Sequence, residues 1–244
     1  MLFGRVTYVQ IKTKIKAEEN YCKGEKIMLD KVTLPSYTKG EEIFNSVSHG
    51  VGILFGIFTM IFCILNSSTG SGVWGSVVFA ASSIVLYFSS TMYHALTKEK
   101  IKKVFRLIDH SVIFIMISGT TLAINLIAVY PYNKTVSLIT GIIGLLITAV
   151  GITLTFIDQE KFKNLQLVLY VVLGFTCIFL GKPIIENNES ALTIILLLLG
   201  GGIVYGIGMA LYIVGKKKHY FHSIFHLFVL MGTVIHFFAI NIAL

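Results

Sequence analysis

The chain has 244 residues, of which 55% are hydrophobic and only 13% are charged. Several apolar runs reach the ~20 residues that a helix needs to cross a ~30 Å hydrocarbon core. The composition therefore indicates an all-α polytopic membrane protein embedded in the lipid bilayer and excludes a soluble globular protein. The formal charge of +8 would suggest nucleic-acid binding on a soluble domain. Here the lysines lie between apolar runs, so membrane topology explains them and we expect no nucleic-acid partner.

The first forty residues differ from the rest in composition. Residues 1–40 mix lysines with acidic residues and contain Pro35, and they lack a short apolar core of the signal-peptide kind. We interpret them as a basic N-terminal tail that precedes a membrane domain over residues 41–244. The three cysteines, Cys22, Cys63 and Cys177, form no CxxC pair, which predicts neither a disulfide framework nor a thiolate zinc site.

Seven apolar segments follow the tail, and each is long enough to be predicted as a transmembrane helix. Because the connections between them are short, sequential neighbours should be antiparallel. The predicted segments are Ile43–Leu65, Val73–Leu96, Leu107–Tyr130, Val136–Ile157, Leu165–Gly181, Ala191–Val214 and Tyr220–Ile242.

The basic residues are distributed unequally between the two sides of these segments. Of the 20 Lys and Arg residues, only Lys134 and Lys182 fall in the connections that share a side with the C-terminus. All the others lie in the tail or after segments two, four and six. The positive-inside rule therefore places the N-terminus in the cytoplasm and, with seven spans, the C-terminus outside.

Polar residues from separate segments fall at one depth, near the predicted cytoplasmic face. His222 and His226 are four residues apart, on one helical face at the start of the last segment. His94 and Ser90 lie at the end of the second segment, and Asp109 lies at the start of the third. Three imidazoles with one open position are the ligand set of a catalytic zinc site. Asp109 and Ser90 could hold the water at that position, or Asp109 could act as a general base.

Other interpretations of these residues stay open. The histidines could be core residues that are hydrogen-bonded to neighbours. Asp109 could be a negative charge near a helix N-terminus, where the helix dipole favours it. Ser90 could donate a hydrogen bond to the backbone carbonyl one turn back. On the first segment, Glu42, Asn45 and His49 share one face and are predicted to brace the cytoplasmic mouth of the bundle rather than to bind metal. His236 shares a face with His222 but lies about 21 Å deeper, so we predict a core histidine outside the site.

These motifs together resemble the progestin and adiponectin receptor family, in its bacterial hemolysin III-like branch. The resemblance covers about residues 40–244. Each motif alone is weak, but their order and spacing together are specific. The matching stretches are Glu42-Ile43-Phe44-Asn45-Ser46-Val47-Ser48-His49, Ser90-x-x-x-His94, Phe105-Arg106-Leu107-Ile108-Asp109, His222-x-x-x-His226 and Val234-Ile235-His236-Phe237-Phe238.

The resemblance implies a seven-helix fold with a cytoplasmic N-terminus. It also implies a Zn²⁺ ion on His94, His222 and His226, with Ser90 and Asp109 near its water. The wider superfamily includes alkaline ceramidases, which hydrolyse lipid amides with a similar residue set. Bacterial members are linked to membrane lipid homeostasis, and an older label describes them as hemolysins.

Three functions are consistent with this sequence. The first is a zinc-dependent hydrolase of a lipid amide or ester, whose substrate is a membrane lipid or fatty-acyl compound. The second is a non-enzymatic membrane sensor or regulator, in which zinc ties segments two and seven together and the tail carries the signal. The third is a pore or transporter, which we rank last because the outer half of the membrane domain has few polar residues.

Overall fold

The computed structural model describes residues 13–14, 29–215 and 218–244. The elements from Lys39 onward are all helical, as the composition predicts. Their bounds are α2 Lys39–Asn66, α3 Gly70–Ala95, α4 Glu99–Ile124, the π-helix η1 Asn125–Val129, α5 Lys134–Phe175, the 3₁₀ helix η2 Thr176–Leu180, α6 Gly181–Asn187, α7 Ala191–Val214 and α8 Phe221–Ala243.

Among the residues that the structure describes, six helical stretches are long and apolar enough to cross a membrane. Four of them reproduce predicted segments to within a few residues (α2, α3, α7 and α8), and α7 has the predicted bounds. The third predicted segment, Leu107–Tyr130, is part of a longer stretch over Glu99–Val129. It therefore begins two turns earlier than hydropathy alone indicates, because its first turns carry lysines at the end of the bundle.

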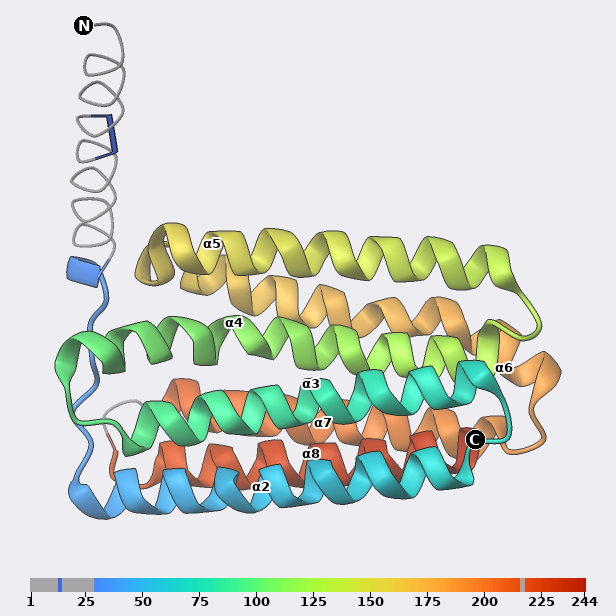
Figure 1. The fold of residues 1–244 in the computed structure, drawn as a ribbon, viewed down its shortest axis with the longest axis horizontal. Coiled ribbons are helices and arrows are strands. Elements are labelled where there is room, and N and C mark those ends of the chain that lie inside the picture. The colour runs from blue at the N-terminus through green and yellow to red at the C-terminus, as the bar shows by residue number, and fades with distance from the viewer. Residues whose placement is uncertain (1–12, 15–28, 216–217) are drawn as a thin grey trace, which may run out of the picture.

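The largest difference from prediction concerns the fourth and fifth segments. Instead of two helices joined by a loop, helical structure continues over 54 residues, Lys134–Asn187. The backbone leaves helical geometry at Asp158 (φ −168°, ψ 92°), and the two halves run back beside each other in Figure 1. The Asp158 carboxylate accepts the backbone N–H of Lys161 at 3.0 Å. This is the N-cap interaction that starts a new helix, so one residue replaces the expected loop.

The fifth predicted segment also ends later than expected. It was predicted to stop at Gly181, but η2 and α6 carry the helical path on to Asn187. Pro183 is the third residue of α6, in the first turn, where a helix tolerates a missing backbone N–H. The Asn187 side chain donates to the Pro183 carbonyl at 2.9 Å and closes the last turn.

The helices form one bundle in which sequential neighbours pack together (Figure 1). α2 packs on α3, α3 on α4, α4 on α5 and α7 on α8, while α8 returns to lie against α2. α4 is the central helix: 72% of the most apolar 18 residues of its span are buried inside the bundle, compared with 17% for α7. The α2–α8 contact brings the start of the first span beside the start of the last, where the candidate site lies.

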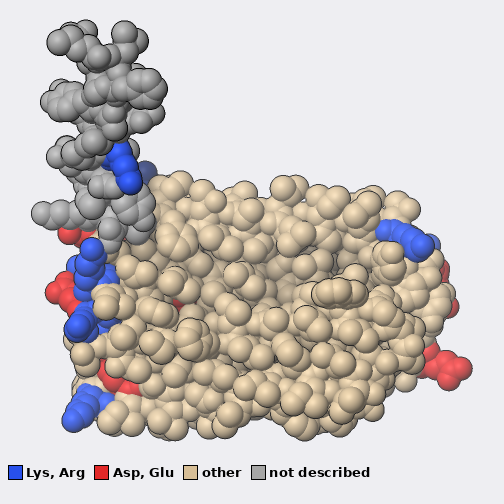
Figure 2. All heavy atoms as spheres, viewed as in Figure 1, with Lys and Arg blue, Asp and Glu red and all other residues tan. Residues whose placement is uncertain are grey.

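The outer surface is apolar between two charged ends. Figure 2 shows Lys and Arg gathered at one end of the bundle and a nearly uncharged surface along its length. We call this the basic end; it comprises the starts of α2 and α8, the α3–α4 connection and the α5 break. Many large apolar side chains point outward on the long helices, including Leu54, Leu146 and Ile203. Such a surface is suited to lipid rather than water, and the chain is a multi-pass integral membrane protein.

Candidate metal centre

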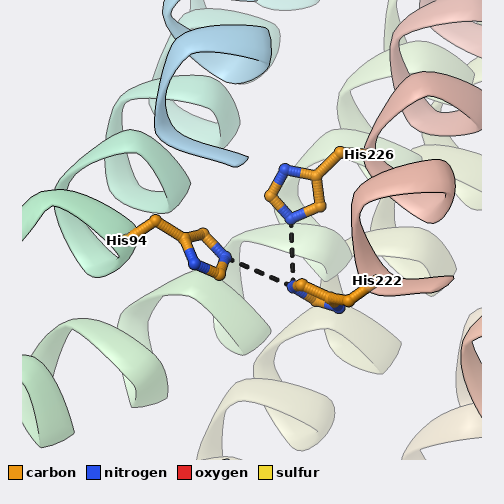
Figure 3. A group of neighbouring side chains, drawn as sticks. All are labelled: His94, His222 and His226. Carbon is orange, nitrogen blue, oxygen red and sulfur yellow. Dashed lines mark hydrogen bonds between the residues drawn. The ribbon is translucent and has the colours of Figure 1, made fainter. Parts of the chain in front are cut away.

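Three histidines converge at the basic end from two helices. His94 is next to the last residue of α3, and His222 and His226 lie one turn apart at the start of α8. The His222 Nε2 atom is 3.2 Å from His94 Nε2 and 3.1 Å from His226 Nε2 (Figure 3). Within the described part of the chain, these three residues form the one group whose ligand atoms could hold a metal ion, all within 4.8 Å of one another.

The spacing of these nitrogens fits a tetrahedral metal ion. Two nitrogens bound at ~2.0–2.1 Å to one tetrahedral zinc ion lie ~3.3 Å apart. The two Nε2···Nε2 distances of 3.2 and 3.1 Å are close to that value. His94 and His226 are almost fully buried, at 3% and 1% exposure. Three imidazoles, two of them buried and one half-buried, whose ring nitrogens lie this close together match the donor set of a three-histidine metal site.

A carboxylate fixes the orientation of His94. Glu42 on α2 accepts a hydrogen bond from His94 Nδ1 at 2.6 Å. Lys102 holds the other carboxylate oxygen at 2.7 Å and also donates to the Leu96 carbonyl at 3.1 Å. Because Nδ1–H donates to the carboxylate, the lone pair of His94 lies on Nε2, the atom that faces the other two histidines. Glu42 was predicted to brace the mouth of the bundle, and the structure places its carboxylate in direct contact with a candidate ligand.

Asp109 and Ser90 lie together beside the histidines. The Ser90 hydroxyl donates to the Asp109 carboxylate, and Asp109 is close enough to His94 for their charges to interact. Ser90 is buried at 1% exposure, whereas Asp109 is partly exposed. The structure therefore pairs Ser90 with the Asp109 carboxylate within electrostatic range of His94.

α2 supplies the wall behind His226. The His49 ring stacks on the His226 ring, with centroids 3.8 Å apart and an angle of 16° between the planes. Its other neighbour is the Tyr87 ring, in an edge contact at 5.0 Å. One turn earlier, Asn45 is fully buried, and neither its amide nitrogen nor its amide oxygen has a hydrogen-bond partner among the described residues. His49 thus supports a candidate ligand by stacking, and it is not a member of the three-histidine group that could hold a metal.

Comparison with known proteins identifies the family. The Haemolysin-III related family model matches residues 37–237, most of the chain and all the residues above. The chain belongs to the haemolysin-III related family. It is 33% identical over 207 residues to a hemolysin-3 homolog of Bacillus subtilis (strain 168), covering 84% of this chain and 94% of that protein. It is 33% identical over 219 residues to hemolysin-3 of Bacillus cereus, covering 87% and 96%.

A human protein is a more distant relative of this haemolysin-III related chain. The monocyte to macrophage differentiation factor of Homo sapiens is 24% identical over 200 residues, covering 75% of this chain and 80% of that protein. The family resemblance found from the motifs is therefore confirmed. The membrane location is confirmed with it.

One aromatic residue of the site was missed by the sequence analysis. Tyr37 lies in the predicted tail, yet its ring stacks on His222 with centroids 5.0 Å apart and planes 19° apart. It also lies 5.6 Å from the His94 ring. The signal was available: Thr38-x-x-Glu41 is a capping box, which places the start of α2 directly after Tyr37. The first helix was instead predicted from hydropathy, which begins at Ile43.

The same capping carboxylate connects α2 to α8. Glu41 accepts the backbone N–H of Thr38 at 2.8 Å and that of Tyr220 at 2.6 Å. Tyr220 is the N-cap of α8 and has a left-handed backbone (φ 62°), which is unfavourable for a residue with a bulky side chain. Glu41 thus holds a strained turn two residues before His222, and this contact fixes where α8 begins.

His236 lies outside the site, as its depth predicted. Its Nε2 atom donates to the Leu198 carbonyl on α7 at 3.1 Å. Its ring packs in an edge contact on Tyr205, with centroids 5.3 Å apart. The prediction of a core histidine is confirmed.

Proposed function

We propose that this haemolysin-III related protein is a zinc-dependent hydrolase of a lipid amide or ester that acts in membrane lipid homeostasis. The observation that carries the proposal is the convergence of three histidines, each with one ring nitrogen within 4.8 Å of the others. The Asp109 carboxylate lies within electrostatic range of one of them, His94. Imidazole nitrogen suits zinc among the common divalent ions, and three protein ligands leave one coordination position for a reacting molecule.

We further propose a topology of seven crossings. If the two halves of the Lys134–Asn187 stretch count separately at the Asp158 break, the six candidate spans become seven. The N-terminus is then cytoplasmic, and the basic end faces the cytoplasm. This orientation puts the histidine cluster at the depth of the inner lipid head groups, where the amide or ester linkage of a membrane lipid lies.

Each polar residue has a defined task in this proposal. A bound zinc ion would act as a Lewis acid and lower the pKa of a bound water toward ~7. His94, His222 and His226 would hold the ion, and Glu42 would keep His94 in the tautomer that can bind it. Asp109, held by Ser90, would take the proton of the attacking water. As the C–N or C–O bond of the substrate breaks, Asp109 would return that proton to the leaving amine or alcohol.

The decisive experiment combines metal analysis with a lipid panel. We expect purified protein to contain one zinc per chain and to release fatty acid from a ceramide, acyl amide or ester. Asp109→Asn should keep the zinc but reduce turnover by ~10²–10⁴-fold, the usual contribution of a general acid–base group. Zinc-loaded protein that releases no fatty acid from any member of a broad panel would contradict the hydrolase.

A structural metal in a membrane regulator is the second candidate. α3 and α8 are not among the closely packed pairs of described helices, and the three candidate ligands come from these two helices. Away from the histidines, the Tyr87 hydroxyl on α3 donates to Thr233 on α8 at 2.6 Å. An ion at the histidines would add a second connection between these two helices, which is the task of a structural site. This candidate predicts that His94→Ala lowers stability only, while deletion of residues 1–40 abolishes the cellular effect. The hydrolase predicts that His94→Ala also abolishes turnover.

A further inference from the structure

The residues immediately before α2 cross the basic end of the bundle. We call residues 29–38 the strap; its first eight residues precede the region that matches the family model, which begins at residue 37. In Figure 1 this segment runs across one end of the bundle, from the side of α4 and α5 to the start of α2. It ends at Thr38, the N-cap of α2.

Polar contacts attach the strap to α5. Lys31 Nζ lies 3.4 Å from an Asp158 carboxylate oxygen, at the break of α5. The Thr33 hydroxyl donates to Glu160 at 2.9 Å. Each contact is partly exposed, so each alone contributes little stability. Together they fix the direction in which the strap crosses the bundle.

Apolar contacts attach the strap to α4. Leu29 and Val32 are buried at 5% and 4% exposure and form a small cluster with Leu107 and Val104. The Val32 backbone N–H donates to the Leu29 carbonyl at 3.1 Å, which closes a turn between them. Burial of these two aliphatic side chains stabilises the packing of the strap against the end of the bundle.

The other end of the strap places Tyr37 over the histidines. Its ring stacks on His222 and leans on His94, at the centroid distances of 5.0 and 5.6 Å. Burial raises the pKa of the Tyr37 phenol, which therefore stays neutral beside the site. Tyr37 comes from the basic end, whereas His49 contacts His226 from within the bundle. The cluster therefore has the Tyr37 ring on the side of the basic end and the His49 ring within the bundle. The rings of Tyr93, Tyr212 and Phe225 also contact its histidines.

We propose that the strap closes the aqueous approach to the histidine cluster, with Tyr37 as its plug. A solute from the water at the basic end must displace the Tyr37 ring before it reaches the Nε2 atoms. Under the proposed function, from which this inference takes its cytoplasmic orientation, Tyr37 becomes a specificity-determining residue. It disfavours water-soluble esters and amides relative to lipids that enter from the bilayer.

The test measures the access of a water-soluble reagent to His222. Metal-free full-length protein in lipid nanodiscs is treated with diethyl pyrocarbonate, and the modification of each histidine is followed by mass spectrometry. His219 is an internal reference because its side chain is 76% exposed. We expect His219 to react quickly in every variant and His222 to react slowly in the wild type.

Three substitutions test whether the Tyr37 ring limits access to His222. Tyr37→Ala should speed modification of His222 by about three- to tenfold, the change that corresponds to loss of one aromatic pair. Tyr37→Phe keeps the ring and should react like the wild type. Tyr132→Ala removes an exposed tyrosine of the α4–α5 connection and is the matched control. If Tyr37→Ala leaves the His222 rate unchanged relative to His219, the plug is wrong.

A second variant keeps Tyr37 and loosens the strap. Lys31→Ala combined with Thr33→Ala removes both polar anchors and should raise the His222 rate by a smaller factor. An unchanged rate in this double variant and in Tyr37→Ala overturns the proposal even if one of them folds less well. For protein that retains zinc, the matching readout is the rate of zinc loss to a water-soluble chelator. The reagent assay needs neither zinc nor turnover, so failure of the proposed hydrolase and failure of the plug give different results.

Discussion

α8 carries buried histidines in two environments that differ in the partners of their ring nitrogens. At its start, the Nε2 atom of His222 lies 3.2 Å from that of His94 and 3.1 Å from that of His226. About 21 Å further along the helix, His236 donates its Nε2 proton to the Leu198 carbonyl. A donor to a carbonyl has no lone pair left on that nitrogen for a metal. The comparison teaches that the partner of each ring nitrogen, rather than the helical pattern, separates a ligand from a core histidine.

The largest expected effect is the loss of metal when a cluster histidine is removed. We predict that His222→Ala weakens zinc affinity by more than ~100-fold, because even partners outside the ligand set contribute ~10–100-fold. His236→Ala should change zinc affinity less than ~2-fold, since its nitrogen is not available to the ion. Bound zinc and competition with a chelator of known affinity measure both. Equal zinc loss in the two variants would remove the distinction between the environments.

The second prediction concerns Glu42, the carboxylate that contacts His94 in the histidine cluster. Glu42→Gln keeps the size of the side chain but weakens the acceptor for His94 Nδ1–H, so zinc affinity should fall by ~10–100-fold. Glu99→Gln is the matched control, because Glu99 pairs with Lys103 at 2.9 Å on an exposed turn. It should bind zinc like the wild type. An unaltered affinity in Glu42→Gln would mean that the short contact is not needed to orient His94.

The sequence predicted the convergence of His94, His222 and His226 because depth is readable from charge. The flanking lysines marked the membrane boundary, and three histidines fell at one distance from it. The Glu42 contact was less accessible: helical spacing places Glu42, Asn45 and His49 on one face, but not which of them faces α3. Tyr37 was missed because hydropathy placed the first helix at Ile43, whereas the capping box starts it at Lys39.

The same limits explain the fold. Apolar length predicted the spans well, and α7 has the predicted bounds. Hydropathy could not distinguish a loop from a one-residue break at Asp158, because the polar stretch after Ile157 is compatible with either. What decides is a local interaction, the Asp158 cap on the Lys161 N–H. Fold class and the depth of the three histidines are thus encoded in composition. The helix break and the contacts that orient the histidines depend instead on single side chains.

A third prediction tests the surroundings of His236 by adding a methyl group to a neighbouring glycine, Gly201. A Cβ on Gly201 would lie 2.3 Å from the His236 ring, so Gly201→Ala must displace that ring. We expect a loss of stability of ~1–3 kcal/mol, typical of overpacking, with unchanged zinc affinity. Gly200→Ala is the matched control because its Cβ would meet nothing within 4 Å. Thermal unfolding in detergent measures stability, and zinc loss in Gly201→Ala would show that the two environments are coupled.

The smallest effect is expected from the hydroxyl network beside His236. The Thr233 hydroxyl oxygen accepts a hydrogen bond from the Tyr87 hydroxyl at 2.6 Å and lies 2.8 Å from the Tyr205 hydroxyl. Side chains from α3, α7 and α8 therefore meet at one oxygen. Tyr205→Phe removes one hydroxyl and keeps the ring that contacts His236, and should lower stability by ~0.5–1.5 kcal/mol. Zinc affinity and the His222 modification rate should stay at wild-type values. A change in either would show that this network supports the metal centre through Tyr87, whose ring lies 5.0 Å from that of His49.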